Sequence, residues 1–189
     1  MRTDRKIFEI TFHARGGQGA KVAAEIIAQA AVKEGKFVQA FPQFGPERSG
    51  APTKTYVRIS DTSIRTHETV IEPDVVMILD ETILDSEEVL KSFGQKEIMI
   101  INSKKTTDEL RAMLNFAGKI YPIDANGISM DIIGAPRPNT VILGKFVQVT
   151  EAVKLDSLTE EFRKIFAEKI GLEMTEKNIR AIEKAYDSI

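Results

Sequence analysis

The chain has 189 residues, the size of one domain with its own hydrophobic core. Its 26 Lys and Arg nearly balance its 28 Asp and Glu, so the formal net charge of −2 gives no reason to expect nucleic acid or a membrane as a partner. The sequence contains no cysteine, which excludes disulfides, thiolate nucleophiles and cysteine-held iron–sulfur clusters from this chain.

The N-terminal segment does not resemble a targeting sequence. Residues 1–12 are charged and lack the apolar core of a signal peptide. Nowhere do about 18 apolar residues run together, as a membrane-spanning helix requires. We therefore expect a cytoplasmic protein.

The first elements form a predicted strand–helix–strand unit. Residues 7–12 show the alternation of a strand, and residues 36–41 are β-prone as well. Between them, residues 20–34 carry apolar side chains on one helical face, and Gly35 stands where a C-terminal cap is expected. Within one sheet this order implies a right-handed parallel crossover.

A long loop and a hairpin are predicted next. Residues 42–53 contain three prolines and two glycines, so they cannot continue the preceding strand as regular structure. Residues 53–59 resume the alternation of a strand. The turn-forming residues 60–63 then lead into residues 64–67, and this pattern predicts a hairpin over 53–67.

The rest of the chain alternates between strands and helices. In chain order we expect buried strands over 74–80 and 96–103 joined by a short helix over 81–93, a strand over 119–123, and helices over 124–134, 140–149, 155–170 and 175–188. Asp124 and Asn139 are the expected N-caps of the first two of those four helices. This order predicts one Rossmann-like three-layer α/β domain over residues 1–189, with a mostly parallel central sheet, a β-hairpin and C-terminal helices.

The glycines between the first strand and the first helix suggest an anion site. Gly16, Gly17 and Gly19 let backbone N–H groups approach an anion at the helix N-terminus, where the helix dipole favours negative charge. Arg15 and Gln18 at the same turn can reach an anion or a protein partner. The same glycines can instead serve only a tight turn and close helix packing, and their spacing alone does not separate the two interpretations.

The better-known site motifs do not fit this sequence. Val22 stands where the dinucleotide fingerprint needs Gly or Ala, and the second strand ends without an acid for a ribose hydroxyl. No phosphate loop of the GxxxxGK[ST] type occurs. Ser49 does not lie in a nucleophile elbow, and His13 and His67 lack a metal-binding setting, so we assign no catalytic residue and no metal site.

The second loop offers a different set of groups on a stiffened backbone. Its candidate ligand or subunit-interface residues are Phe44, Gly45, Pro46, Glu47 and Arg48. Both loops follow strand C-termini, where open α/β sheets place their ligands, so the two loops could line one crevice. Asp80 and Glu81 also end a strand on that side, although residues there commonly cap the next helix. The alternative is a surface loop with a local ion pair.

Three segments together resemble a known family. The stretches ARGGQGAKVAAEIIAQAA, EGKFVQAFPQFGPERSGAP and EPDVVMILDETIL closely resemble the gamma subunit of 2-oxoacid:ferredoxin oxidoreductases, most strongly the pyruvate type. The resemblance covers roughly residues 8–170, with the elements in the family's order. The chain departs from many relatives at Arg48-Ser49-Gly50, where they carry Arg-Gly-Gly, so a backbone that requires positive φ at position 49 is not expected.

The resemblance implies a role inside a larger enzyme. Such complexes decarboxylate a 2-oxoacid on thiamine diphosphate with Mg²⁺, pass electrons through [4Fe-4S] clusters to ferredoxin, and transfer the acyl group to coenzyme A. The implied partners are the alpha, beta and delta subunits, with ferredoxin as electron acceptor. This chain has neither the cysteines for clusters nor the GDG segment with a following Asn that holds thiamine diphosphate. We therefore expect an architectural subunit, inactive alone, that contributes part of the coenzyme A pocket.

The sequence leaves three other interpretations of the function open. The complex could act on 2-oxoisovalerate or 2-oxoglutarate, because substrate preference should lie with the catalytic subunits. The chain could also be a free-standing nucleotide-binding protein or NAD-type oxidoreductase that uses Gly17 and Gly19. A purely structural interaction module is a third reading.

Overall fold

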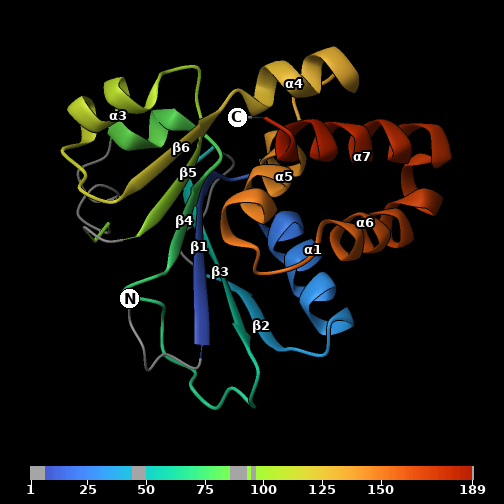
Figure 1. The fold of residues 1–189 in the computed structure, drawn as a ribbon, viewed down its shortest axis with the longest axis horizontal. Helices are drawn as coiled ribbons and strands as arrows, with labels where there is room; N and C mark the ends of the chain where they lie inside the picture. The colour runs from blue at the N-terminus through green and yellow to red at the C-terminus, as the bar shows by residue number, and fades with distance from the viewer. Residues whose placement is uncertain (1–6, 44–49, 86–92, 95–96, 189) are drawn as a thin grey trace.

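The computed structural model describes residues 7–43, 50–85, 93–94 and 97–188. At its centre is a six-stranded sheet with the order β2-β3-β1-β4-β5-β6 (Figure 1). The strands are β1 Ile7–Arg15, β2 Phe37–Pro42, β3 Pro52–Ser60, β4 Val75–Ile78, β5 Ile98–Asn102 and β6 Lys119–Ile123. The helices are α1 Ala20–Lys33, the 3-10 helix η1 Glu81–Asp85, α3 Thr107–Leu114, α4 Ala125–Ile132, α5 Pro138–Thr150, α6 Leu155–Ile170 and α7 Leu172–Tyr186.

The sheet is mostly parallel, as the sequence predicts. Strand β1 pairs in parallel with β4, β4 with β5, and β5 with β6. Strand β3 is antiparallel to both of its neighbours, β1 and β2. Strand β2 therefore runs in the same direction as β1, as the predicted crossover requires, but β3 is inserted between the two.

The predicted hairpin over residues 53–67 is wrong. Strand β3 ends at Ser60, and residues 64–67 form no strand. Both edges of β3 are instead occupied by β1 and β2. Val57 lies opposite Ile10 of β1, and Tyr56 lies opposite Phe41 of β2. Residues 61–69 are too polar to bury a strand face, which explains the difference. The antiparallel pairs are β1–β3 and β2–β3, and of these only β2 and β3 follow each other along the chain.

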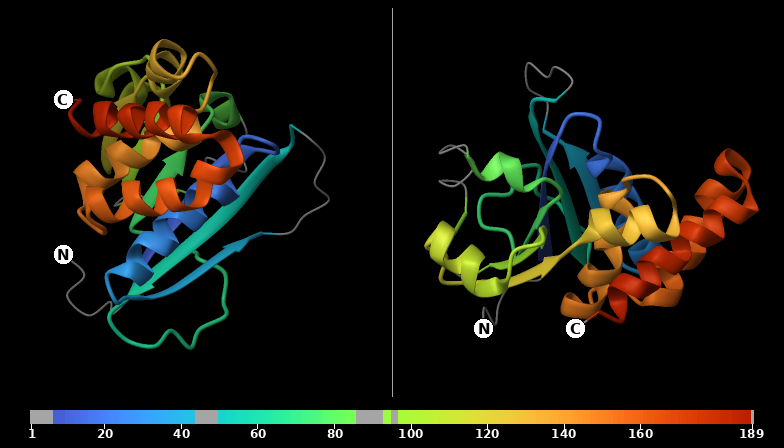
Figure 2. Two further views of the ribbon diagram at one scale, coloured as in Figure 1. Left: turned by 90° about the vertical axis from the view of Figure 1, so that its right-hand side faces the viewer. Right: turned by 90° about the horizontal axis from the view of Figure 1, so that it is seen from above.

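Helices cover both faces of the sheet, which confirms the three-layer prediction. Helices α1, α5, α6 and α7 lie on one side, while η1 and α3 lie on the other (Figure 1). Helix α1 packs on β2 and β3 through a face of small side chains that include Ala23, Ala24, Ala30 and Ala31, all buried. Helices α6 and α7 lie side by side, with α6 against α1 and α7 against α5 (Figure 2).

Most of the predicted helices are found at the expected positions. Helix α6 has the predicted bounds, and the side chain of Asp124 caps α4 by accepting a hydrogen bond from the Gly127 N–H at 2.8 Å. Asn139 is not the cap of α5, because Pro138 occupies the first helical position and Arg137 becomes the N-cap. Of the helix predicted over 81–93, residues 81–85 form η1 and residues 86–92 lie outside the described residues.

Helix α3 is not predicted from the sequence. It has only eight residues and a narrow apolar face, so hydrophobic periodicity does not reveal it. Its N-terminus does carry a capping box, in which Thr106 and Glu109 bond each other's backbone N–H groups. Within the described part of the chain, no helix is long and apolar enough to cross a membrane.

Candidate functional site

The glycine turn joins β1 to α1. Strand β1 continues to Arg15, so the turn proper is residues 16–19. Gly17 and Gly19 have φ values of +92° and +81°, in the left-handed region that side chains disfavour. Gly19 is the N-cap of α1, which has no side-chain cap and no acidic residue in its first turn. The positive end of the helix dipole is thus left without a compensating carboxylate on its own helix.

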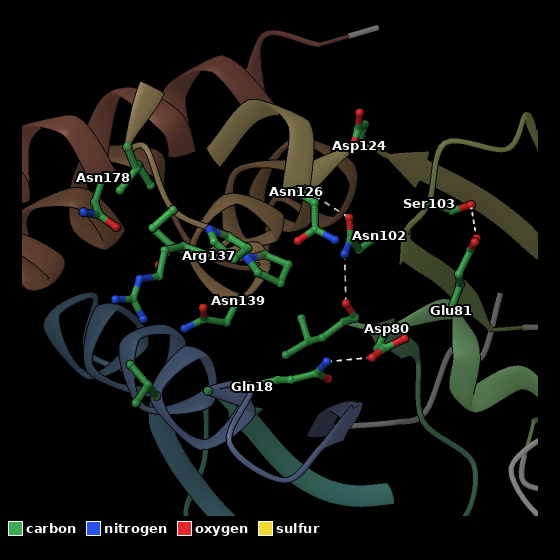
Figure 3. A pocket seen from close by; sticks show the side chains of 18 of the residues that line it. Gln18, Asp80, Glu81, Asn102, Ser103, Asp124, Asn126, Arg137, Asn139 and Asn178 are labelled. Atoms are coloured by element: carbon green, nitrogen blue, oxygen red, sulfur yellow. Dashed lines mark hydrogen bonds between the residues drawn. The ribbon is translucent and has the colours of Figure 1, made fainter. Parts of the chain in front are cut away.

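Hydrogen bonds fix this turn to the end of β4. The Gln18 side chain accepts from the Arg15 backbone N–H at 2.7 Å and donates through Nε2 to Asp80 Oδ2 at 2.6 Å (Figure 3). The Arg15 guanidinium donates to Thr82 Oγ1 at 2.8 and 2.9 Å and to the Gly50 carbonyl at 3.2 Å. The turn is therefore held in one arrangement by residues from η1 and from the start of β3.

Asp80 has two roles at this junction. It accepts hydrogen bonds from the Thr82 backbone N–H and hydroxyl at 2.9 and 2.7 Å, which is the local capping that the sequence suggests. It also accepts from Gln18 across the site. Burial acts to raise the pKa of Asp80, but hydrogen bonds from Thr82 and Gln18 and the charge of Arg15 outweigh it and lower the pKa below its usual value.

A cavity of about 1090 Å³ opens beside the turn. It lies beyond the carboxyl ends of β1, β4 and β5, where α1 covers one face of the sheet and η1 the other. Such a switch between faces is where open α/β sheets bind their ligands. Its polar lining includes Gln18, Asp80, Asn102, Asn126, Arg137 and Asn139 (Figure 3). Its apolar wall includes Val22, Leu79, Phe162, Phe166, Ile170 and Met174.

The start of α5 forms the side of the cavity opposite Asp80. The amide of Asn139 lies so close to Gly19 that a Cβ at position 19 would come within 2.6 Å of Asn139 Nδ2. A side chain at position 19 would therefore displace the Asn139 amide, in addition to straining the backbone at positive φ. The Arg137 side chain is exposed at the cavity and forms no ion pair with any residue that the structure describes. This leaves a guanidinium available for an anionic ligand.

A second cationic group of the lining is already engaged. Lys105 Nζ donates to Glu81 Oε1 at 2.8 Å, and the Ser103 hydroxyl donates to Glu81 Oε2 at 2.5 Å. These hydrogen bonds, first from Lys105 and then from Ser103, lower the pKa of Glu81 below its usual value. The group joins η1 to the segment after β5 and so shapes the cavity edge on that side.

The structure brings some of the predicted site residues together. Gly17, Gln18 and Gly19 line the cavity, whereas Arg15 at the end of β1 and Gly16 in the turn do not. The Gly16 N–H donates to the Ala51 carbonyl at 2.8 Å, so the end of the second loop lies beside the turn. Phe44, Gly45, Pro46, Glu47 and Arg48 lie outside the described residues. A crevice shared by both loops stays a prediction.

Sequence reasoning missed the residues on the far side of the cavity. Asn102 ends β5 and Asn126 follows β6 by three positions, so the strand-end rule that identified Asp80 could also have identified them. Arg137 and Asn139 flank Pro138, which in the sequence indicates only an interruption of regular structure. No local pattern shows that α5 starts beside the glycine turn. Among the described residues, no group of three or more His, Asp or Glu could hold a metal ion.

Comparison with known proteins agrees with this architecture. The family model described as pyruvate ferredoxin/flavodoxin oxidoreductase matches residues 9–188. The pyruvate/ketoisovalerate oxidoreductases common subunit gamma of Thermococcus kodakarensis is 44% identical over 96% of both chains. The pyruvate synthase subunit PorC of Thermotoga maritima is 39% identical over 100% of this chain and 98% of its own length.

A solved structure supports the same relationship. The crystal structure of the pyruvate oxidoreductase subunit PORC from Thermotoga maritima superposes with a TM-score of 0.86, at 38% identity and 97% coverage of both chains. These matches confirm the resemblance to gamma subunits that three sequence segments carried. The chain belongs to the pyruvate ferredoxin/flavodoxin oxidoreductase family.

Proposed function

We propose that this chain is the gamma subunit of a multi-subunit pyruvate:ferredoxin oxidoreductase, and that its cavity forms part of the coenzyme A site. The complex converts pyruvate and coenzyme A to acetyl-CoA and CO₂ and reduces ferredoxin in the cytoplasm. Full-length similarity to PorC and to common gamma subunits supports the subunit role. Alpha, beta and delta subunits are the proposed partners.

The division of labour follows from what this chain contains. It has no cysteine to ligate iron–sulfur clusters, and it has no GDG segment with a following Asn for thiamine diphosphate and Mg²⁺. We therefore assign those groups, and the chemical steps that they carry out, to the partner subunits. Its own contribution is to bind and orient the coenzyme A co-substrate.

One observation carries the coenzyme A proposal, namely the cavity at the switch between the two faces of the sheet. Its volume of about 1090 Å³ lies slightly above the usual range for ligand pockets, which suits a coenzyme-sized molecule. The uncapped N-terminus of α1 and the free guanidinium of Arg137 suit phosphate groups. The amides of Asn102, Asn126 and Asn139 offer donors and acceptors, and the α6–α7 wall offers apolar surface.

The experiment uses the complete complex purified through a tag on this chain. Copurification of thiamine- and cluster-bearing subunits tests the subunit role, and a chain that purifies alone would contradict it. Arg137→Ala then tests the site. Loss of a charge-assisted contact should raise the KM for coenzyme A roughly tenfold or more, with the KM for pyruvate unchanged.

A matched variant controls for the loss of a surface arginine. Arg65→Ala removes another exposed guanidinium, at a residue that does not line the cavity. We expect the Arg65→Ala complex to keep the KM of the unmodified enzyme. An unchanged KM for coenzyme A in Arg137→Ala would reject this cavity as the coenzyme site while leaving the subunit role intact.

A second function is favoured by one relative. The gamma chain of Thermococcus kodakarensis is named as common to pyruvate and ketoisovalerate oxidoreductases. We infer that this chain can also serve two sets of catalytic subunits, because the two chains are 44% identical over 96% of both lengths. Finding two distinct thiamine-bearing partner sets with the tagged chain would support sharing. Tight NAD or ATP binding by the chain alone, measured by calorimetry, would favour the free-standing alternative.

A further inference from the structure

A chain of polar contacts surrounds the cavity. On one side, the Asn102 amide donates to the Leu79 carbonyl at 2.9 Å and accepts from the Asn126 N–H at 3.2 Å (Figure 3). The Asn126 carbonyl accepts from the Ser129 hydroxyl at 3.0 Å, and that hydroxyl accepts from the Arg137 N–H at 3.0 Å. The ends of β4 and β5 are thus connected through α4 to the start of α5.

The chain of contacts closes on itself at the glycine turn. Asn139 lies against Gly19. The neighbouring residue Gln18 donates to Asp80, which follows Leu79 directly. Starting from Leu79, these contacts therefore form a ring that returns to Leu79 through the polar walls of the cavity, whereas the apolar wall from α6 and α7 lies outside the ring.

Ser129 is the member of the ring that does not line the cavity. Its side chain is fully buried, at 0% exposure. A single hydroxyl both donates and accepts here, which an alanine of nearly the same size cannot do. Arg137 is the N-cap of α5, so its N–H does not take part in the hydrogen bonds within the helix. This N–H donates to the Ser129 hydroxyl instead.

Pro138 links the hydrogen bond between Arg137 and Ser129 to the residues that line the cavity. Its ring fixes φ, so the orientation of residue 137 sets the path of the backbone into the first turn of α5. The Arg137 carbonyl accepts from the Thr140 and Val141 N–H groups at 3.1 and 3.3 Å, which holds residue 137 to α5, and the Ser129 hydroxyl holds its N–H from the other side. The bond to Ser129 therefore ties Arg137 and Asn139, which both line the cavity, to α4. Without it, the N-cap region gains freedom while the rest of α5 stays packed.

We propose that Ser129 is a positioning residue for the ligand of this cavity: its buried hydroxyl fixes the Arg137 backbone and thereby holds Arg137 and Asn139 at the glycine turn. The identity of the ligand in this inference rests on the proposed function, whereas the positioning role rests on the hydrogen bonds of Ser129. A ligand that meets a preorganised wall binds more tightly, because the ordering of residues 137–139 has already taken place.

The test measures Ser129→Ala in the complete complex. We expect the KM for coenzyme A to rise about three- to tenfold while kcat changes less than about twofold, as expected for a lost positioning contact. Hydrogen exchange supplies a readout independent of activity. The Arg137 amide should exchange roughly tenfold faster in the variant, because its hydrogen-bond acceptor is gone.

Thr175→Val is the matched control. Thr175 is also fully buried, its hydroxyl donates to a helical carbonyl, that of Gly171, at 2.8 Å, and it does not line the cavity. A comparable loss of stability is expected, with an unchanged KM for coenzyme A and an unchanged exchange rate at Arg137. If both variants raise the KM equally, Ser129 has only a general structural role and the proposal is overturned.

A double-mutant cycle separates this proposal from the proposed function. If Ser129 acts through the lining residues, Ser129→Ala should add less than about twofold to the KM in an Arg137→Ala/Asn139→Ala background. An unchanged KM in Arg137→Ala/Asn139→Ala alone would refute the coenzyme A site. A raised KM in that variant, with unchanged KM and Arg137 exchange in Ser129→Ala, would refute the positioning role alone.

Discussion

At the residue scale, one position combines a backbone requirement with a contact. Gly19 has φ of +81°, and its missing Cβ makes room for the Asn139 amide. The two requirements have different consequences. The backbone angle bears on stability, whereas the Asn139 side chain can swing aside at small cost and so bears on the shape of the cavity.

Gly19→Ala is therefore expected to affect ligand binding beyond its effect on stability. Placing a side chain at this φ should lower the free energy of unfolding by about 1–2 kcal/mol. Gly35→Ala is the control, because Gly35 has φ of +79° and a Cβ there would meet nothing within 4 Å. Urea denaturation should show similar losses for both, while only Gly19→Ala raises the KM for coenzyme A. Equal KM values for coenzyme A in the two variants would contradict a role of the contact between Gly19 and Asn139 in ligand binding.

His13 gives the chain a pH dependence of known sign. It is 3% exposed on β1 and packs edge-on against Phe93, with ring centroids 5.3 Å apart. Burial, with a smaller effect from the charge of Lys54, lowers its pKa from 6.5 to about 3. Between those pH values the unfolded chain binds a proton at this histidine and the native chain does not. Stability is therefore lost as the pH falls from 6.5 toward 3.

The substitution His13→Gln should remove this contribution. From about pH 6 to pH 4, unfolding free energies of the unmodified chain should fall more steeply than those of the variant, by up to about 1.4 kcal/mol per pH unit. Denaturant titrations at several pH values would measure both slopes. Parallel profiles across that range would show that native His13 accepts a proton and would contradict the burial argument.

At the element scale, the sequence predicts elements well where one signal dominates. The buried strands follow directly from their apolar runs and α6 from its apolar residues at helical spacing, and Asp124 caps α4 as its residue type suggests. The failures occur where a non-local partner decides the outcome. Strand β3 pairs with β1 and β2, and the start of α5 lies against the glycine turn, far away in the sequence. The same non-locality hid Arg137 and Asn139, whereas Gly17, Gln18 and Gly19 lie in one local motif.

The contact between α5 and α7 depends on a single glycine. A Cβ at Gly144 would overlap the backbone carbonyl oxygen of Ile182 and lie 2.8 Å from the backbone nitrogen of Tyr186. Because these atoms belong to the backbone of α7, no side-chain rotation can relieve the overlap. Gly144→Ala should lower the free energy of unfolding by about 2–3 kcal/mol or more by forcing the helices apart.

The comparison that checks this expectation uses Gly134→Ala. There a Cβ meets nothing within 4 Å, so only the cost of φ at +83° remains, about 1–2 kcal/mol. Thermal or chemical denaturation of the two variants should rank Gly144→Ala as the more destabilised. The reverse ranking would mean that α5 and α7 adjust to the added methyl group.

At the scale of the whole molecule, the sheet separates two cores of unequal size. The larger lies between the sheet and the helices α1, α5, α6 and α7. The smaller lies under η1 and α3 and contains few side chains. The cavity opens where the two halves meet, with Gly19 and Asn139 on the side of the large core and Asp80 and Glu81 on the side of the small one. Its walls therefore belong to two separately packed regions.

The unequal cores predict that α3 can unfold while the large core stays folded. Leu110 is the buried residue of α3 and belongs to the small cluster, whereas Leu158 of α6 is equally buried, at 0% exposure, in the large one. Each Leu→Ala change should cost about 2–5 kcal/mol locally. Because opening free energies differ between regions, Leu110→Ala should speed amide exchange in residues 107–114 and leave residues 20–33 protected, while Leu158→Ala weakens protection in both. Loss of protection in residues 20–33 of the Leu110→Ala chain, to the same extent as in residues 107–114, would show instead that the two cores unfold as one cooperative unit.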